Sequence, residues 1–227
     1  MNWGAMSRAE RDAAYDNAAA VSNSPALNEA RIAASARFRR SAAGALDLAY
    51  GPGERQRWDL FPAADPAAPC LVFIHGGYWQ RNRREDFCAL GEGLHGAGWS
   101  LALPGYTLAP AARLTDIVAE IHAALDWLAQ EGKSHGIGGP ILLSGWSAGG
   151  HLAAMALAHP AVAAGLAISG IYELGPIRDT SLNEALRLSD EEIAALSQLR
   201  LPPVNKTLAI AYGTRELPSL VADSRAL

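Results

Sequence analysis

The run Gly145-Trp146-Ser147-Ala148-Gly149, read with its flanks, limits the fold of this chain more than any other feature. Residues 141–143 before it are apolar and predict a buried strand, and residues 151–158 after it predict a helix. A serine between such a strand and helix lies on a tight turn, with its hydroxyl raised above the sheet. The two glycines leave room where strand and helix crowd together. An isolated match of this kind is as often a surface turn, so a second signal is needed.

That second signal is the run His75-Gly76-Gly77-Tyr78-Trp79, which follows the apolar strand predicted at 71–74. Glycine lets a backbone turn its N–H groups toward a reacting carbonyl without a Cβ in the way. We therefore expect Gly77 and Tyr78, together with Ala148 after the serine, to donate to a developing oxyanion. Losing one such donor costs roughly 3 kcal/mol of transition-state stabilisation. The two runs in this order make the surface-turn interpretation the minor one.

The rest of the chain alternates between strand and helix patterns after an initial hairpin. This order predicts an α/β fold with a mainly parallel sheet, an N-terminal antiparallel hairpin and helices on both faces. The expected strands are 46–50, 57–61, 71–74, 99–103, 141–143, 165–168 and 207–212, and the expected helices are 26–39, 83–97, 114–129, 151–158 and 217–227.

We interpret residues 1–227 as one domain with two additions. Residues 1–45 are rich in Ala and Arg and predict a helical arm packed on the domain. Residues 173–203 carry more charge and proline and predict a small cap, with short helices near 182–188 and 190–199.

Composition excludes several classes of function. A net charge of −4 over 227 residues gives no basic surface for nucleic acid or an anionic membrane. No stretch is apolar enough to span a bilayer, and the first residues do not resemble a signal peptide. Cys70 and Cys88 lack metal or redox spacing and are expected to be reduced thiols. We expect a cytoplasmic protein that needs no metal or organic cofactor.

A serine hydroxyl needs a base to take its proton and a carboxylate to orient that base. In known enzymes whose catalytic serine lies on a strand-to-helix turn of this kind, the acid follows a later strand and the histidine follows the acid. Residues 213–216, which follow the strand predicted at 207–212, occupy the acid place, and Glu216 is the candidate acid. Asp223 is a weaker candidate, further along the same segment. The other interpretation of Glu216 is an exposed carboxylate at a helix N-terminus.

No histidine follows Glu216: the six are His75, His95, His122, His135, His151 and His159. None has an arguable route to the serine as its base, and His75 is better suited to orienting the glycine loop. We therefore expect a chain truncated before a closing strand and a histidine loop. An unpaired sheet edge would then favour association, and a homodimer is one outcome.

At this point the sequence resembles the kynurenine formamidase (arylformamidase) branch of the esterase and lipase α/β-hydrolases. The resemblance rests on residues 75–80 and 145–152, and continues through residues 14–17, 48–51, 58–61, 104–110 and 180–184. It implies an α/β-hydrolase fold, Ser147 as nucleophile, Glu216 as acid, and oxyanion donors at Gly77, Tyr78 and Ala148. The chain departs from the pattern in having Glu rather than Asp as acid and in lacking the histidine.

The expected chemistry is hydrolysis of a carboxylic ester or an aryl formamide through an acyl-enzyme, with weak or no activity without the histidine. Tyr78, Trp79 and Tyr106 are expected to give flat apolar walls, or else to be core residues. The remaining pocket candidates are His75, Gly76, Trp146 and Asn183. The alternative function is a non-catalytic hydrolase-fold protein that binds a small ligand or a partner. An interfacial lipase is disfavoured, because the cap is charged.

Overall fold

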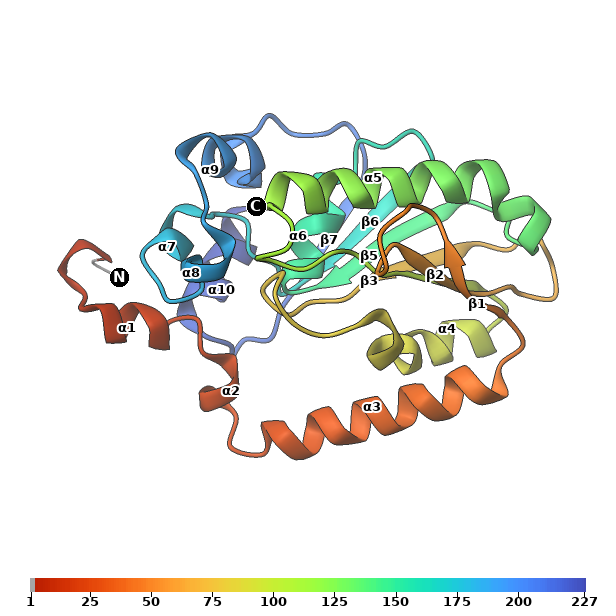
Figure 1. Cartoon of the computed structure of the whole chain (residues 1–227), viewed down its shortest axis with the longest axis horizontal. Helices are drawn as coiled ribbons and strands as arrows, with labels where there is room; N and C mark the ends of the chain where they lie inside the picture. Colours follow the sequence, from red (N-terminus) through yellow and green to blue (C-terminus); the bar gives the residue numbers. More distant parts are fainter. Residues whose placement is uncertain (1–2) are drawn as a thin grey trace.

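The computed structural model describes residues 3–227, which form a seven-stranded sheet with helices on both faces (Figure 1). The strand order is β1-β2-β4-β3-β5-β6-β7. The strands are β1 (Ala45–Ala49), β2 (Arg57–Phe61), β3 (Cys70–Ile74), β4 (Ser100–Pro104), β5 (Ile141–Trp146), β6 (Val162–Ile168) and β7 (Leu208–Ala211).

The sheet confirms the predicted fold class. β1 and β2 pair antiparallel as a hairpin, and β2 also runs antiparallel to β4. The pairs from β4 through β3, β5 and β6 to β7 are all parallel. Every residue of β3 and of β4 is buried, as a strand covered on both faces requires. The carboxyl ends of β3, β5, β6 and β7 therefore meet at one edge of the sheet.

Different helices cover the two faces of the sheet (Figure 1). On one face lie α5 (Leu114–Glu131) and α6 (Ala148–Met155). On the other lie α3 (Ser24–Ser41), the 3-10 helix η2 (Arg84–Gly91) and α4 (Glu92–Gly96). α3 packs along η2, and η2 packs on β3 and β4. The apolar positions 117, 118, 121, 125 and 128 of α5 face the core as the spacing predicts.

Short helices form both the N-terminal arm, which precedes α3, and the cap, which follows β6. The arm holds α1 (Arg8–Ala13) and α2 (Asn17–Ala20), and the cap holds α7 (Gly175–Arg178), α8 (Asn183–Leu186) and α9 (Asp190–Leu196). α10 (Pro218–Ala226) follows β7. The sequence did not indicate α7, which is a single turn. Within residues 3–227, no helix combines the length and apolar character needed to cross a bilayer.

The arm and the cap are joined by side-chain hydrogen bonds. Asp12 Oδ1 accepts from the N–H of Ser181 at 2.6 Å, and Trp3 Nε1 donates to Asp179 Oδ2 at 3.0 Å. These contacts bring α1 beside the cap at the carboxyl edge of the sheet (Figure 1), where the candidate site lies.

Candidate active site

Ser147 lies on a strained turn between β5 and α6. Its φ and ψ are 57° and −120°, a region that non-glycine residues avoid unless the surroundings enforce it. The surroundings are tight: a Cβ on Gly145 would lie 2.1 Å from the Gly149 carbonyl oxygen. A Cβ on Gly149 would lie 2.0 Å from the Ile74 oxygen. Both flanking glycines are therefore required by contact with backbone, as the sequence pattern predicts.

The loop that follows β3 lies directly against this turn. A Cβ on Gly76 would lie 2.4 Å from the Trp146 carbonyl oxygen and 3.1 Å from the Ser147 Cβ. Beyond it the backbone turns sharply, with positive φ at Gly77 (123°), Tyr78 (50°) and Trp79 (58°). The structure thus brings residues 76–79 and Ser147 together, although they are about 70 positions apart in the chain.

Two side chains hold the Gly76 carbonyl. His75 Nδ1 lies 2.8 Å from it, and Asn82 Nδ2 donates to it at 3.0 Å. Burial lowers the pKa of His75 to about 3, so its ring is neutral, and Nδ1 carries the proton that it donates. In a trans peptide the next N–H points opposite to the carbonyl. Fixing the Gly76 oxygen therefore fixes the direction of the Gly77 N–H.

The three N–H groups expected as oxyanion donors have no acceptor among the described residues. Those of Gly77 and Tyr78 join no hydrogen bond there, and Ala148 N–H is the first of α6 and has no preceding turn to bond. Unpaired backbone donors beside a serine hydroxyl can stabilise a negatively charged oxygen bound to that serine's substrate.

Glu216 is connected to the serine through β6. The Ser147 N–H donates to the Ile168 carbonyl at 2.8 Å. The next residue, Ser169, donates its hydroxyl to Glu216 Oε1 at 2.7 Å. The Gly213 N–H donates to the same oxygen at 2.9 Å. The other oxygen, Oε2, is buried and has no partner within residues 3–227. A donor such as an imidazole N–H would satisfy it.

Asp223, the weaker acid candidate, has a different set of contacts. Its Oδ2 accepts the N–H groups of Tyr172 at 2.8 Å and Glu173 at 3.1 Å. Burial raises its pKa to about 6 despite these two bonds. Asp223 therefore fastens the start of the cap to α10. Glu216, which has one oxygen without a partner within residues 3–227, is the better candidate for orienting a base.

No hydrogen bond in the described chain joins a histidine to the Ser147 hydroxyl. His151 Nε2 donates to the Leu196 carbonyl at 2.8 Å, and burial lowers its pKa to about 4. The His75 ring lies between Tyr106 and Phe87. His159 pairs with Asp126 Oδ1 at 3.1 Å. His95 contacts the Trp99 carbonyl. Each of these four has a structural partner away from the serine.

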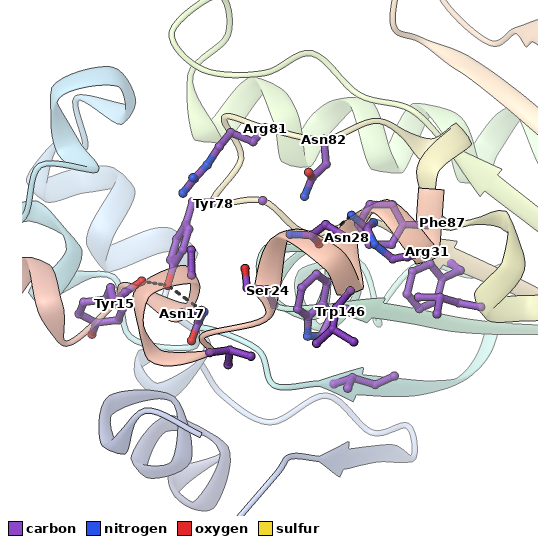
Figure 2. Close-up of a pocket in the computed structure, with 18 of the residues that line it drawn as sticks. Tyr15, Asn17, Ser24, Asn28, Arg31, Tyr78, Arg81, Asn82, Phe87 and Trp146 are labelled. Carbon is purple, nitrogen blue, oxygen red and sulfur yellow. Dashed lines mark hydrogen bonds between the residues drawn. The ribbon is translucent and has the colours of Figure 1, made fainter. Parts of the chain in front are cut away.

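A cavity of about 940 Å³ opens beside the serine and is lined mainly by apolar side chains (Figure 2). Gly77, Tyr78, Trp146 and Ser147 line it, as expected. The far wall comes from the arm, with Tyr15 and Asn17, and from α3, with Ser24, Asn28 and Arg31. The sheet contributes Leu142, Leu166 and Ile168.

Several expected pocket residues do not line this cavity, which corrects the expectation for them. Trp79 and Tyr106 are fully buried in the core. Trp79 packs edge-on against His151, and the Tyr106 hydroxyl donates to the His75 carbonyl at 2.8 Å. Asn183 Oδ1 accepts from the Leu188 N–H inside the cap. His75 and Gly76 support the loop from behind. Within residues 3–227 no cluster of three or more His, Cys, Asp or Glu side chains is placed to hold a metal ion.

The sequence did not indicate the residues that hold the site from outside the two motifs. Tyr78 donates its hydroxyl to the Tyr15 carbonyl at 2.6 Å and accepts from Asn17 Nδ2 at 3.3 Å (Figure 2). Asn82 and Ser169 bond the Gly76 carbonyl and Glu216 as described above. These contacts depend on how the arm packs against the ends of the strands, which no local sequence pattern indicates.

Comparison with known proteins places this chain in a family. A profile of the BD-FAE family matches residues 60–163, which include both glycine runs. Kynurenine formamidase from Salmo salar is 30% identical over 204 residues, covering 83% of this chain and 68% of that protein. The chain belongs to the α/β-hydrolase family of kynurenine formamidases and related esterases.

A second kynurenine formamidase agrees with this membership. Kynurenine formamidase from Danio rerio is 30% identical over 196 residues, covering 79% of this chain and 66% of that protein. The chain therefore spans about two thirds of the length of these two formamidases.

Solved structures share the same fold. A candidate thioesterase from a Silicibacter species has a TM-score of 0.88 at 31% identity, covering 96% of this chain and 86% of that one. Esterase B from Lactobacillus rhamnosis has a TM-score of 0.73 at 20% identity, covering 96% and 79%. At that identity, the second structure supports the fold alone.

Proposed function

We propose that this chain carries the nucleophile, oxyanion and acid groups of a serine hydrolase for carboxylic esters or aryl formamides. The observation that carries the proposal is the strained Ser147 turn, placed against a loop with unpaired N–H groups. The relatives named kynurenine formamidase and esterase support this substrate class.

In the proposed reaction, the Ser147 hydroxyl attacks the carbonyl carbon of the ester or formamide. The N–H groups of Gly77, Tyr78 and Ala148 donate to the oxyanion that forms. The alcohol or amine leaves with a proton, and an acyl group stays on the serine oxygen. Water then attacks the acyl group and releases the acid. Glu216 orients the base through its unpaired Oε2.

None of the six histidines of this chain is placed to act as the base. Four of them are held by other partners, and His122 and His135 lie on α5 and after it, away from the carboxyl edge of the sheet. Loss of a triad member lowers turnover by up to about a millionfold in well-studied hydrolases. We therefore expect residues 1–227 alone to be a weak catalyst.

Chemical rescue tests this account. Free imidazole can act as the base where a site lacks its own, so added imidazole should raise turnover of p-nitrophenyl acetate and of an N-formyl aryl amine. The rise should reach a plateau at high imidazole concentration and be absent in Ser147→Ala. The turnover measured with that variant also gives the background reaction of imidazole alone. Glu216→Gln should reduce the rise, because an amide orients an imidazole less well than a carboxylate.

The relative turnover of the two substrates distinguishes a formamidase from a broad esterase. The second candidate function is a non-catalytic protein that binds small ligands in the cavity, favoured by the lack of a histidine at Ser147. Turnover equal in the unmodified protein and in Ser147→Ala, with and without imidazole, would support that second function and reject the first. A cytoplasmic location belongs to the same proposal, since Cys70 and Cys88 are free and buried.

A further inference from the structure

Arg31 is an arginine of the cavity wall whose hydrogen-bond acceptors carry no charge. It lies in the second turn of α3 and lines the cavity that also contains Ser147. Its Nη1 donates to the Asp86 carbonyl at 3.3 Å and its Nη2 to Asn28 Oδ1 at 3.2 Å. Both acceptors are neutral. Within residues 3–227 no carboxylate lies at ion-pair distance from this guanidinium.

The charge of Arg31 is also poorly hydrated. The residue is half-buried, and its guanidinium carbon lies 3.8 Å from the centre of the Phe87 ring. Burial lowers its pKa from the ordinary value, and the charge of Asp86 offsets this only in part. Asp86 is itself paired with Arg83 at 3.3 Å. A half-buried cation without its own anion favours an anionic ligand.

An aromatic surface lies next to this cation. The Trp146 ring centre is 6.0 Å from that of Phe87, and 36% of Trp146 is exposed. Trp146 directly precedes Ser147 in the chain, so its aromatic surface lies beside the candidate nucleophile as well as beside Phe87. Figure 2 shows Arg31, Phe87 and Trp146 grouped on one side of the cavity, away from Tyr15 and Asn17.

The other charged groups of the cavity do not form a second site of this kind. Arg81 is exposed, and its guanidinium lies 5.9 Å from the Tyr78 ring. The carboxylates are Asp12, which accepts the Ser181 N–H, and Asp16, which caps α2. Both belong to the arm before α3. Of the two arginines that line the cavity, Arg31 is the half-buried one, so an anion bound there is better shielded from water and salt.

We propose that Arg31 and Trp146 form a subsite for a small aromatic carboxylate, the guanidinium binding the carboxylate and the indole packing on the ring. A planar guanidinium matches a carboxylate through two parallel N–H bonds, and an exposed indole offers a flat apolar face. The inference rests on the proposed function, because it assigns the subsite to the substrate or product of Ser147. It predicts a preference for acids, esters and formamides that carry both a ring and an anion.

Equilibrium binding tests the subsite without requiring catalysis. Benzoate and benzamide have the same shape and differ in charge, and both can be titrated by calorimetry against residues 1–227. We expect benzoate to bind at least about tenfold more tightly than benzamide, the value of one charge-assisted hydrogen bond. In Arg31→Gln the benzoate affinity should fall to that of benzamide, which should itself stay unchanged.

Matched variants make the result specific. Arg81→Gln removes the exposed arginine and should leave benzoate affinity within about twofold, since an exposed charge pair contributes little. Arg31→Lys keeps the charge without the planar fork and should give an intermediate affinity. It also serves if Arg31→Gln fails to fold, as judged by thermal unfolding.

Equal binding of benzoate and benzamide to the unmodified protein would overturn the inference. So would an equal loss of both ligands in Arg31→Gln, which would mean that Arg31 only fastens α3 to Phe87. Ser147→Ala should still bind benzoate with the same dependence on Arg31. Retained binding together with no imidazole rescue would reject the proposed hydrolase while leaving the subsite in place.

Discussion

The serine and the carboxylate of the candidate site lie at the same edge of the sheet, but their surroundings differ. Ser147 is 6% exposed, and backbone atoms press on the glycines at both sides of it. Glu216 is half-buried in the loop before α10, and one of its two oxygens has no partner in the described chain. The serine half is thus fixed by backbone packing, whereas the acid half is held by two hydrogen bonds and has capacity for a third.

The two halves therefore depend on the rest of the molecule in different ways. The serine turn and the loop at 76–79 hold each other, so their geometry is complete within residues 3–227. The acid loop positions one carboxylate oxygen and leaves the other available. We expect changes at the serine half to affect folding, and changes at the acid half to affect reactivity more than folding.

The largest expected effect comes from Gly149→Ala. The new Cβ would meet the Ile74 oxygen, and neither strand β3 nor helix α6 can move without losing its packing. We expect a loss of at least about 4 kcal/mol in the free energy of unfolding, or no folded protein. Urea titration measures this. Gly93→Ala in α4, where a Cβ meets nothing within 4 Å, is the control and should be neutral or stabilising.

The next effect is a loss of stability on acidification from pH 6.5 to 5. His75 and His151 have folded pKa values of about 3 and 4, so only the unfolded chain takes up their protons. This costs up to about 2 kcal/mol for each histidine. Asp223, with a folded pKa of about 6, takes up its proton in the folded state and works in the opposite direction by about 1 kcal/mol.

The net expectation is a fall of about 2–3 kcal/mol in the free energy of unfolding over that range. Urea titrations at the two pH values measure it. Asp223→Asn should make the fall steeper, because it removes the opposing group. Equal stability at pH 6.5 and 5 would mean that the two histidines are not buried as neutral rings.

A smaller effect is expected from Asn82→Ala. This variant removes one of the two donors to the Gly76 carbonyl and loosens the direction of the Gly77 N–H. We expect the imidazole-rescued turnover to fall about tenfold, with a change in stability of about 1 kcal/mol. Asn205→Ala, on an exposed loop, is the matched control. Unchanged turnover in Asn82→Ala would show that this bond does not position an oxyanion donor.

The smallest expected effect on stability is that of Glu216→Gln. The amide oxygen can still accept from Ser169 and Gly213, and the side chain is half-buried, so the change should stay below about 1 kcal/mol. Urea titration measures this, and Gly149→Ala gives the scale. A loss as large as that of Gly149→Ala would end the contrast between the two halves.

The sequence predicted those parts of the fold and of the candidate site that depend on local pattern. Alternating strand and helix segments predicted the sheet, and the crowding between β5 and α6 is encoded in Gly145 and Gly149. The arm was predicted as helical, but not its place as a wall of the cavity. Trp79 and Tyr106 were expected to be either pocket walls or core, and only the tertiary packing decides that they are core.

Arg31 shows most clearly what the sequence could not indicate. It is one of several arginines in a helix rich in Ala and Arg, and nothing in its spacing distinguishes it from Arg37 or Arg40. It gains its place in the cavity only when α3 docks on η2 and brings it over Phe87.

The most direct test of the central claim is site-resolved labelling with a fluorophosphonate. The claim is that the Ser147 hydroxyl is a nucleophile facing unpaired backbone N–H groups. Mass spectrometry of the labelled, digested protein should find one adduct, on the peptide that contains Ser147, formed faster with imidazole and absent in Ser147→Ala. An adduct on another residue, or none at any imidazole concentration while the protein remains folded, would contradict the account.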